Sequence, residues 1–321
     1  YESDTFESSF QFALSNPYIT KNNVEGYFNF ERIYRSYGNK YMYFKEQRNI
    51  YSTTLGATWK LTSNIRYGLS SNYFIEKDNN STEVLDNGEK PWAHYVFLSN
   101  KLFSNMFNRY ILPDQGHRWD VFCQTSLPLG DYTYVDCGFS FQYYYPLGRS
   151  GWTLYQSLVF RSMFPYGETS KSVIPSTRLM SCGGAEDIRG YHFSSVGPEI
   201  QTLQSDGTYT YKTVGGNIKG LFKTELIIPN SLFNLDYDQL RFSLFLDAAQ
   251  LWRTVAVPDS YNENGNTYLP AEGIRLTTGI CARFISPIMP PMTISLNYPL
   301  IQKDRDHFKY EYLSFGSQID F

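Results

Sequence analysis

The segment LRFSLFLDAAQLW, Leu240 to Trp252, alternates apolar and polar side chains along its length. Successive side chains of a β-strand point to opposite faces of the sheet. The segment would therefore place one set of residues on each face, with Leu240, Phe242, Leu244 and Leu246 opposite Arg241, Ser243, Asp247 and Ala249. The first face is apolar throughout and the second carries both charges, which predicts a strand between an apolar and a polar environment.

The same period of two recurs from one end of the 321-residue chain to the other. It predicts about thirteen strands, most of roughly nine to fourteen residues, and no helix. A tilted strand crosses a bilayer with about 9–11 residues, so these segments are long enough to do so. The expected strands cover residues 8–15, 24–34, 50–61, 64–75, 92–103, 117–127, 132–145, 152–164, 217–228, 240–252, 274–285, 292–300 and 308–321.

The composition favours a membrane barrel over other classes of protein. No run of about eighteen apolar residues is present, which excludes a transmembrane helix. Aromatic residues reach 18%, yet the mean hydropathy is −0.39, as expected where lipid-facing side chains alternate with polar lumen-facing ones. The net charge of −3 gives no clustered basic face for nucleic acid. The four cysteines match no zinc spacing, so no metal or other cofactor is expected.

The connections between the expected strands alternate between short turns and longer, polar, variable loops. Outer-membrane barrels have short periplasmic turns and longer extracellular loops. The fold class is therefore predicted to be all-β, a transmembrane antiparallel β-barrel, with residues 1–321 forming a single domain in the bacterial outer membrane. Because such barrels have an even number of strands, we expect at least one further strand before Tyr1, with three as the preferred number.

The charged residues of the strand at 217–228 fit this prediction. Phe222, Leu226 and Ile228 would face lipid, which leaves Lys223 and Glu225 in the lumen. A basic residue that faces lipid near the midplane costs roughly 2–4 kcal/mol, so the lumen is the favourable side for these charges.

The carboxyl end of the chain carries a separate signal. Ser314, Gly316, Ile319 and Phe321 form the pattern polar-x-Gly-x-x-apolar-x-aromatic. This pattern resembles the terminal signal of bacterial outer-membrane barrels. The last strand is therefore predicted to end on the periplasmic side, and Gly316 would weaken its pairing and permit a bend.

The longest connection contains the segment RLMSCGGAEDIRGYHFSSVGPEI, Arg178 to Ile200, which is an unusually specific sequence for a loop. Four other landmarks accompany it along the chain, namely SNPYI, ILPDQGHRW, VGGNIKGLFKTELIIP and RFSLFLDAAQLW. In their order and spacing, the five landmarks resemble the BamA-type family of outer-membrane assembly proteins over essentially the whole chain.

The resemblance implies a sixteen-stranded barrel, of which this chain holds about thirteen strands, preceded by periplasmic modules. It also implies a long extracellular loop that folds back into the lumen. The tip of this loop, Arg189, Gly190 and Tyr191, would dock on Glu225 and Asp247 and form a loop latch. An arginine fork can bind a carboxylate through two hydrogen bonds, although desolvation offsets part of the gain. On spacing alone, Arg189 could equally be a solvated loop charge.

Several small residues near the latch matter to this interpretation. Gly183 and Gly184 would permit a tight bend. Ala249 follows Asp247 where the family commonly has glycine, and its methyl group could alter how closely the loop packs. Cys182 could pair with a partner outside the chain. Cys123 and Cys137 would lie opposite each other on the lipid face, where an oxidising envelope would permit a disulfide.

The resemblance implies a function without covalent chemistry. The protein would fold and insert barrel proteins through a lateral seam, with unfolded outer-membrane clients, assembly lipoproteins, periplasmic chaperones and the lipid bilayer as partners. Three alternatives stay open: a two-partner secretion transporter for specific proteins, a passive porin and a barrel enzyme such as a phospholipase. The enzyme is the weakest, because no serine or acid lies at a telling distance from His94, His117, His192 or His307.

Overall fold

An antiparallel sheet of 13 strands dominates the fold. The computed structural model describes residues 6–20, 24–37, 42, 46–78, 92–109, 112–149, 151–167, 174–204, 206–233, 239–263, 265–284 and 292–315. In sheet order, the strands are β1 (Phe6–Thr20), β2 (Val24–Tyr37), β3 (Glu46–Lys60), β4 (Ile65–Asp78), β5 (Trp92–Asn105), β6 (Gly116–Ser126), β7 (Tyr134–Pro146), β8 (Thr153–Pro165), β11 (Ile218–Ile228), β12 (Leu240–Trp252), β14 (Arg275–Phe284), β15 (Met292–Ile301) and β16 (Glu311–Phe315).

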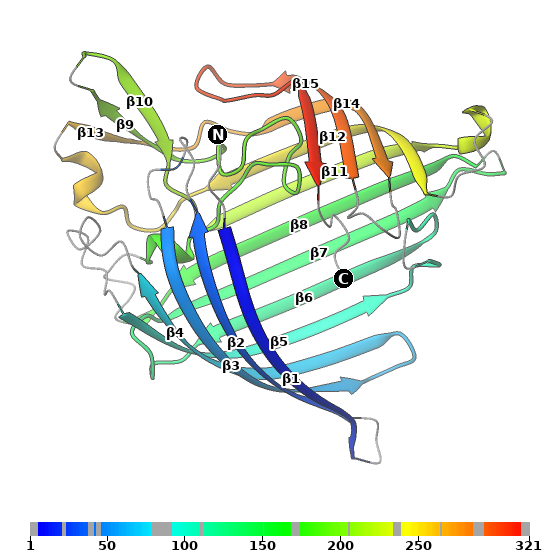
Figure 1. The fold of residues 1–321 in the computed structure, drawn as a ribbon, viewed down its shortest axis with the longest axis horizontal. Helices are drawn as coiled ribbons and strands as arrows, with labels where there is room; N and C mark the ends of the chain where they lie inside the picture. The colour runs from blue at the N-terminus through cyan, green and yellow to red at the C-terminus, as the bar shows by residue number, and fades with distance from the viewer. Residues whose placement is uncertain are drawn as a thin grey trace.

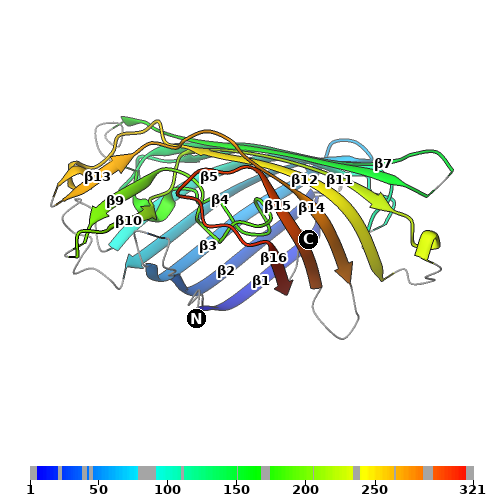
Figure 2. The same cartoon turned by 90° about the horizontal axis from the view of Figure 1, so that it is seen from above.

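The sheet curls on itself; part of the chain between β8 and β11 lies inside the curl, whereas β9 and β10 lie at one end of it beside β13 (Figures 1 and 2). Every pair of neighbouring strands is antiparallel, from β1 and β2 to β15 and β16. Each expected strand therefore corresponds to one strand of this sheet. The prediction of an all-β antiparallel barrel wall is confirmed.

The alternation of side chains divides the sheet into an outer and an inner face. Phe222 and Leu244 are 38% and 44% exposed, whereas Glu225 and Asp247 are 3% and 0% exposed. In a barrel wall only the outer face meets lipid, so the charged residues lie on the inner face, where they can find partners. The faces predicted for the strands at 217–228 and 240–252 are those of the structure.

The last strand differs from its expected extent. Residues 308–321 were expected to form one strand, but the described strand β16 covers only Glu311–Phe315. Phe308 and Lys309 pair with the loop inside the curl, through the antiparallel bridge of Tyr191 with Phe308 and the bond from Lys309 to Gly190. Tyr310 still accepts a hydrogen bond from the amide of Asn297 in β15. Gly316, Ile319 and Phe321 of the terminal signal lie outside the described residues.

A second, three-stranded sheet joins two of the long loops. Its order is β10 (Tyr209–Thr213), β9 (Glu199–Leu203) and β13 (Asn266–Leu269), so β13 comes from the connection between β12 and β14. All three segments were expected to lie in loops. Strands of four or five residues are too short to show a period of two, and their pairing joins segments far apart in the chain.

In the part of the chain that the structure describes, helical structure is limited to short turns. The described residues contain the 3-10 turns η3 (Ser176–Arg178), η4 (Asn230–Phe233) and η5 (Asp259–Asn262). No helix of the described chain is long and apolar enough to cross a membrane.

Candidate functional site

The loop between β8 and β11 supplies much of the buried core. Cys182, Ile188 and Tyr191 are fully buried in one cluster with side chains of the wall, among them Tyr95 and Leu251. This part of the loop is thus packed against the inner face of the sheet, whereas Leu203 and Tyr209 further along the loop are 51% and 55% exposed. Cys182 cannot reach a partner outside the chain in this arrangement, which corrects the expectation for this residue.

Arg189 binds both acids of the predicted latch. Its Nε and Nη2 donate to the two carboxylate oxygens of Asp247, at 2.7 and 2.6 Å, and its Nη1 donates to Glu225 Oε1 at 2.7 Å. The backbone amide of Arg189 also donates to Asp247 Oδ2 at 3.2 Å. All three side chains are at most 3% exposed. The fork therefore satisfies two carboxylates from neighbouring strands at once.

The surroundings of the Arg189 guanidinium make this contact specific. Its Cζ lies 3.7 Å from the ring centre of Phe245, which covers one face of the guanidinium. Ser243 Oγ donates to the second oxygen of Glu225 at 3.1 Å, and Arg283 Nη2 lies 3.6 Å from Oε1. Removing one partner of such a buried pair costs about 3–5 kcal/mol, because the remaining charge is stranded. The arrangement fixes one position of the loop tip.

Gly190 and Tyr191 connect the loop tip to the approach of the last strand. The backbone amide of Lys309 donates to the carbonyl of Gly190 at 2.6 Å. The rings of Tyr191 and Phe308 meet edge to face, with centroids 5.1 Å apart. Gly190 has φ +88, and a Cβ there would lie 2.5 Å from the Phe308 ring. Only glycine fits this close approach without a shift of the ring.

The segment that meets the loop tip is itself held in place. Asp306 accepts hydrogen bonds from Arg275 Nε and Nη2, each at 2.8 Å, and from the Lys303 amide at 2.8 Å. Asn297 of β15 donates its amide to the Tyr310 carbonyl at 2.6 Å and its side chain to the Lys309 carbonyl at 3.2 Å. Residues 302–310 thus form an ordered bridge between β15, β16 and the loop tip.

The double glycine makes the bend that brings the tip back. Gly183 and Gly184 have φ values of +121 and +93, and a Cβ on Gly183 would lie 2.3 Å from the His192 carbonyl oxygen. The Gly184 amide donates to the Tyr191 carbonyl at 3.1 Å. Lys219 Nζ of β11 binds Asp187 at 2.9 Å within the bend. These contacts close the loop into a compact turn.

A second anchor holds the start of the loop on a different part of the wall. Arg178 and Arg48 both bind the carboxylate of Glu76, and Arg48 Nη1 also donates to the Thr177 carbonyl at 3.0 Å. The Arg178 guanidinium lies over the rings of Phe74 and Tyr95, at 4.2 and 4.6 Å. This loop anchor, Arg48, Glu76 and Arg178, joins β3 and β4 to η3.

The loop anchor and the contact of the loop tip with Phe308 and Lys309 were not predicted from the sequence. Glu76 lies one residue beyond the strand expected at 64–75. Because side chains alternate along a strand, Glu76 lies on the same inner face as Phe74, two residues earlier. An acidic residue on the inner face suggests an arginine partner, but the sequence does not indicate that this partner is Arg178. The contact of Lys309 with Gly190 is a hydrogen bond between two backbone groups, so it cannot be predicted from residue types.

The remaining predicted residues are placed as follows. Cys123 and Cys137 are register partners on β6 and β7, with both thiols free. Their disulfide stays a prediction that non-reducing mass spectrometry can check. Ala249 is 1% exposed within the same core cluster as Ile188, so its methyl group is accommodated. Ser314 lies in β16, and its backbone pairs with Thr293.

Arg189 and Glu199, which lie outside the membrane-length strands of the wall, both have shifted pKa values. Burial would lower the pKa of Arg189, but the charges of Glu225 and Asp247 hold it above its ordinary value, so the guanidinium stays charged. Burial raises the pKa of Glu199 in β9 to about 7, against the opposing effect of Arg305. Arg305 Nη1 lies 3.5 Å from Glu199 Oε2. Of these two groups, Glu199 is therefore the one whose charge changes near neutral pH.

A curled antiparallel wall of membrane-length strands that binds its own loop inside defines an outer-membrane β-barrel with an internal loop. The chain belongs to the Omp85 superfamily, whose domain model matches residues 2–321. This family of assembly and transport barrels is located in the outer membrane, and the chain is assigned to that membrane.

The relatives differ in how much of the chain they resemble. The outer membrane protein assembly factor BamA of Neisseria meningitidis is 25% identical over 74% of the chain. The crystal structure of BamA from Haemophilus ducreyi lacking POTRA domains 1–3 matches 96% of the chain with a TM-score of 0.80 and 22% identity. CdiB from Acinetobacter baumannii matches 97% with a TM-score of 0.56 and 10% identity. The chain spans 30% of the first relative and 61% of the second.

Proposed function

We propose that this barrel folds and inserts other β-barrel proteins into the outer membrane through a seam at its last strand. The BamA relatives support an assembly role, since the curated relative carries that function in its name. The observation that carries the proposal is the bridge between the loop tip and the approach to β16. A barrel that only passes solutes would have no use for a loop tied to its terminal strand.

The seam would act as a template for an incoming strand. An unpaired strand edge presents backbone donors and acceptors that another strand can bind. β16 pairs with β15 over the five positions from Leu296 to Met292. Above this stretch, Asn297 still binds the carbonyls of Tyr310 and Lys309, and Phe308 and Lys309 bind the loop tip. Residues 298–301 of β15 lie beyond the last pairing with this segment in the described chain, and a client strand could extend the pairing there.

The loop latch would control how firmly the terminal strand is held. Arg189 fixes the tip on β11 and β12, and the tip in turn holds Phe308 and Lys309. Release of Arg189 would free the approach to β16 and allow the strand to move with its client. The chemistry is hydrogen-bond exchange between strands, without a covalent step, and no enzyme activity is assigned.

The proposed partners follow from this mechanism. Unfolded outer-membrane proteins would be the clients, the lipid bilayer their destination, and assembly lipoproteins and periplasmic chaperones the accessory factors. Depletion of the full-length protein in its own cells, followed by quantitative proteomics of the outer membrane, tests the proposal. Many unrelated barrel proteins should decline together, and Arg189→Glu should reproduce part of this loss at normal protein level. The matched control is Arg149→Glu in an exposed turn.

The second candidate is an export barrel that passes specific proteins through its lumen. The family includes transport barrels as well as assembly barrels, which supports it. In the same depletion experiment, this function would leave the other barrels at their normal level and remove one secreted protein.

A further inference from the structure

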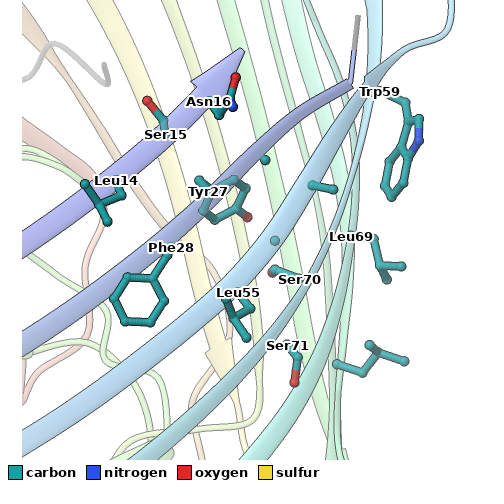
Figure 3. A pocket seen from close by; sticks show the side chains of 14 residues that line it. Leu14, Ser15, Asn16, Tyr27, Phe28, Leu55, Trp59, Leu69, Ser70 and Ser71 are labelled. Carbon is teal, nitrogen blue, oxygen red and sulfur yellow. The ribbon is translucent and has the colours of Figure 1, made fainter. Parts of the chain in front are cut away.

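The outer face of the barrel wall is almost free of charge. Around the shallow groove on β1 to β5, the outward-facing side chains are mostly apolar, as Phe28, Leu55 and Leu69 illustrate (Figure 3). The alternation of side chains places the charged residues of the described wall strands β1 to β15 on the inner face, with two exceptions. The exceptions are Arg32 on β2 and Lys77 on β4. Because a lipid-facing charge is costly at the midplane and nearly free of cost at the interface, both residues should lie near an interface.

Strand register establishes that both cations face outward. Arg32 lies four residues beyond Phe28 on β2, and Lys77 lies eight residues beyond Leu69 on β4. The pairing from β2 to β4 is uninterrupted, so these even spacings keep both cations on the face of Phe28 and Leu69. Glu76, which precedes Lys77, lies on the opposite face and is buried in the lumen.

The length of β4 places Lys77 at the extracellular level of the membrane. Trp59 and Tyr67 are register partners beside the short turn between β3 and β4, with ring centroids 5.6 Å apart, and they mark the periplasmic girdle. Lys77 follows Tyr67 by ten residues on the same strand. Ten residues rise about 33 Å along a strand, or about 25 Å across the membrane at a tilt of about 40°. This is the height of the apolar band of an outer-membrane barrel, so Lys77 lies among the headgroups of the outer leaflet.

Each of the two cations lies over an aromatic ring. Lys77 Nζ lies 5.1 Å from the ring centre of Trp92 on β5, and Arg32 Cζ lies 5.6 Å from that of Tyr51 on β3. Trp92 is 47% exposed, as expected for an aromatic side chain at the membrane interface. Within the described residues, neither cation forms an ion pair with a carboxylate. This part of the wall therefore presents two oriented positive charges to the outer leaflet.

The spacing of the two cations suits a single headgroup. Tyr51 is the register partner of Arg32 and of Ile75, and Lys77 follows Ile75 by two residues. Two strand spacings of about 4.8 Å and two residues of about 3.3 Å each give a Cα separation of about 12 Å. Arginine and lysine have long, flexible stems, so their charged ends can converge on one anion between them.

We infer that Arg32 and Lys77 bind the phosphate-bearing headgroup of a lipid of the outer leaflet, with its acyl chains on the apolar face of β2 to β4 below them. Guanidinium and ammonium groups are the side-chain groups that bind phosphate in proteins. A lipid complements both parts of this surface, whereas an acidic soluble protein would complement the cations alone. The site depends on the location of the barrel in the outer membrane and is independent of the seam and of the proposed insertion activity.

Native mass spectrometry of the full-length protein tests the site. The protein in mild detergent is titrated with diphosphorylated lipid A, and separately with the same lipid after enzymatic removal of its phosphates, and bound copies are counted. The wild type should bind a single copy of the phosphorylated lipid saturably and the dephosphorylated lipid more weakly. The double variant Arg32→Gln, Lys77→Gln should bind the phosphorylated lipid on the order of thirtyfold more weakly, with about fivefold from each cation.

The matched control is the double variant Lys60→Gln, Arg66→Gln. Lys60 and Arg66 are exposed register partners of β3 and β4, and their even numbers of residues from Glu76 and its neighbours on each strand place them on the inner face. This variant loses the same charge and should keep the affinity of the wild type. Folding of each variant is verified by its electrophoretic mobility before and after heating.

Three results would overturn the inference. The first is equal weakening of lipid binding in the two double variants, and the second is equal affinity of the wild type for the two forms of lipid A. The third is displacement of the phosphorylated lipid by polyglutamate at an equal concentration of anionic groups, which would assign the two cations to an acidic protein.

Discussion

The backbone amide of Lys309 donates a hydrogen bond to the carbonyl of Gly190 at 2.6 Å, and so joins the approach to the last strand with the tip of the internal loop. The side chains beside this bond, Tyr191 and Phe308, reinforce it by ring contact. Arg189 lies next in the chain and is bound to two wall strands. Through three consecutive residues, the loop therefore contacts β11, β12 and the segment before β16.

Gly190→Ala should weaken this junction. The substitution adds strain at φ +88 and places a methyl group 2.5 Å from the Phe308 ring. We expect faster hydrogen exchange at residues 308–311. Gly148→Ala is the matched control, since Gly148 has φ +72 but no atom within 4 Å of a Cβ. It should show the backbone strain alone, on the order of 1–3 kcal/mol, and leave that exchange unchanged. Equal exchange in both variants would mean that the close approach to Phe308 is unimportant.

A disulfide between the loop tip and the approach to β16 should block insertion. Tyr191 and Phe308 are bridge partners, a geometry compatible with a disulfide, so Tyr191→Cys and Phe308→Cys can be combined in a chain without its native cysteines. Oxidised protein in proteoliposomes should insert a reporter barrel severalfold more slowly than the same protein after reduction. A pair at Thr53 and Tyr73, which links only β3 and β4, should not respond to oxidation. An active oxidised tip pair would contradict the proposed release.

Glu76→Ala should loosen the start of the loop. Glu76 is 4% exposed and is the shared carboxylate of Arg48 and Arg178, so its removal should cost about 3–5 kcal/mol. Glu7→Ala breaks the exposed pair with Arg35 and should cost at most about 1 kcal/mol. Denaturant titration of the heat-modifiable band measures both changes. Similar values for the two variants would show that the loop anchor does not stabilise the barrel.

The three-stranded sheet should become less stable as the pH rises from about 4.5 to 7. Burial raises the pKa of Glu199 to about 7 in the folded state, so the folded form retains a proton that the unfolded form has lost in this interval. The stabilisation is complete below the unfolded pKa and is lost as pH passes the folded value. Hydrogen exchange in β9, corrected for its intrinsic pH dependence, should accelerate on the order of tenfold.

Glu199→Gln carries no titrating proton and provides the control for this pH dependence. Its β9 exchange should stay nearly constant over the same interval. If the variant shows the same pH dependence of β9 exchange as the wild type, the effect belongs to another group, such as Asp306 or Glu272, which also lie near Arg305.

The barrel wall was predictable because a single local rule decides it. Alternation fixed which residues face lipid, and this assignment placed Glu225 and Asp247 together inside before any contact was known. The resemblance to a known family then connected them to Arg189. The sheet of β9, β10 and β13 escaped prediction because its strands are short and its pairing joins separate loops. The bridge at Lys309 escaped because backbone hydrogen bonds do not depend on residue type.

The pairing of Gly190 with Lys309 also sets an order of events for the chain's own folding. The ion pairs of Arg189 join residues 36 and 58 positions apart, whereas the bond to Lys309 spans 119 positions, from 190 to 309. Contacts of long sequence separation form late, after their loop-closure entropy has been offset. The loop can therefore reach its acids early, but its tip becomes complete only when the C-terminal segment arrives. A chain truncated before Lys309 would form the ion pairs of Arg189 but lack the hydrogen bond between Lys309 and Gly190. This bond therefore distinguishes complete from incomplete chains.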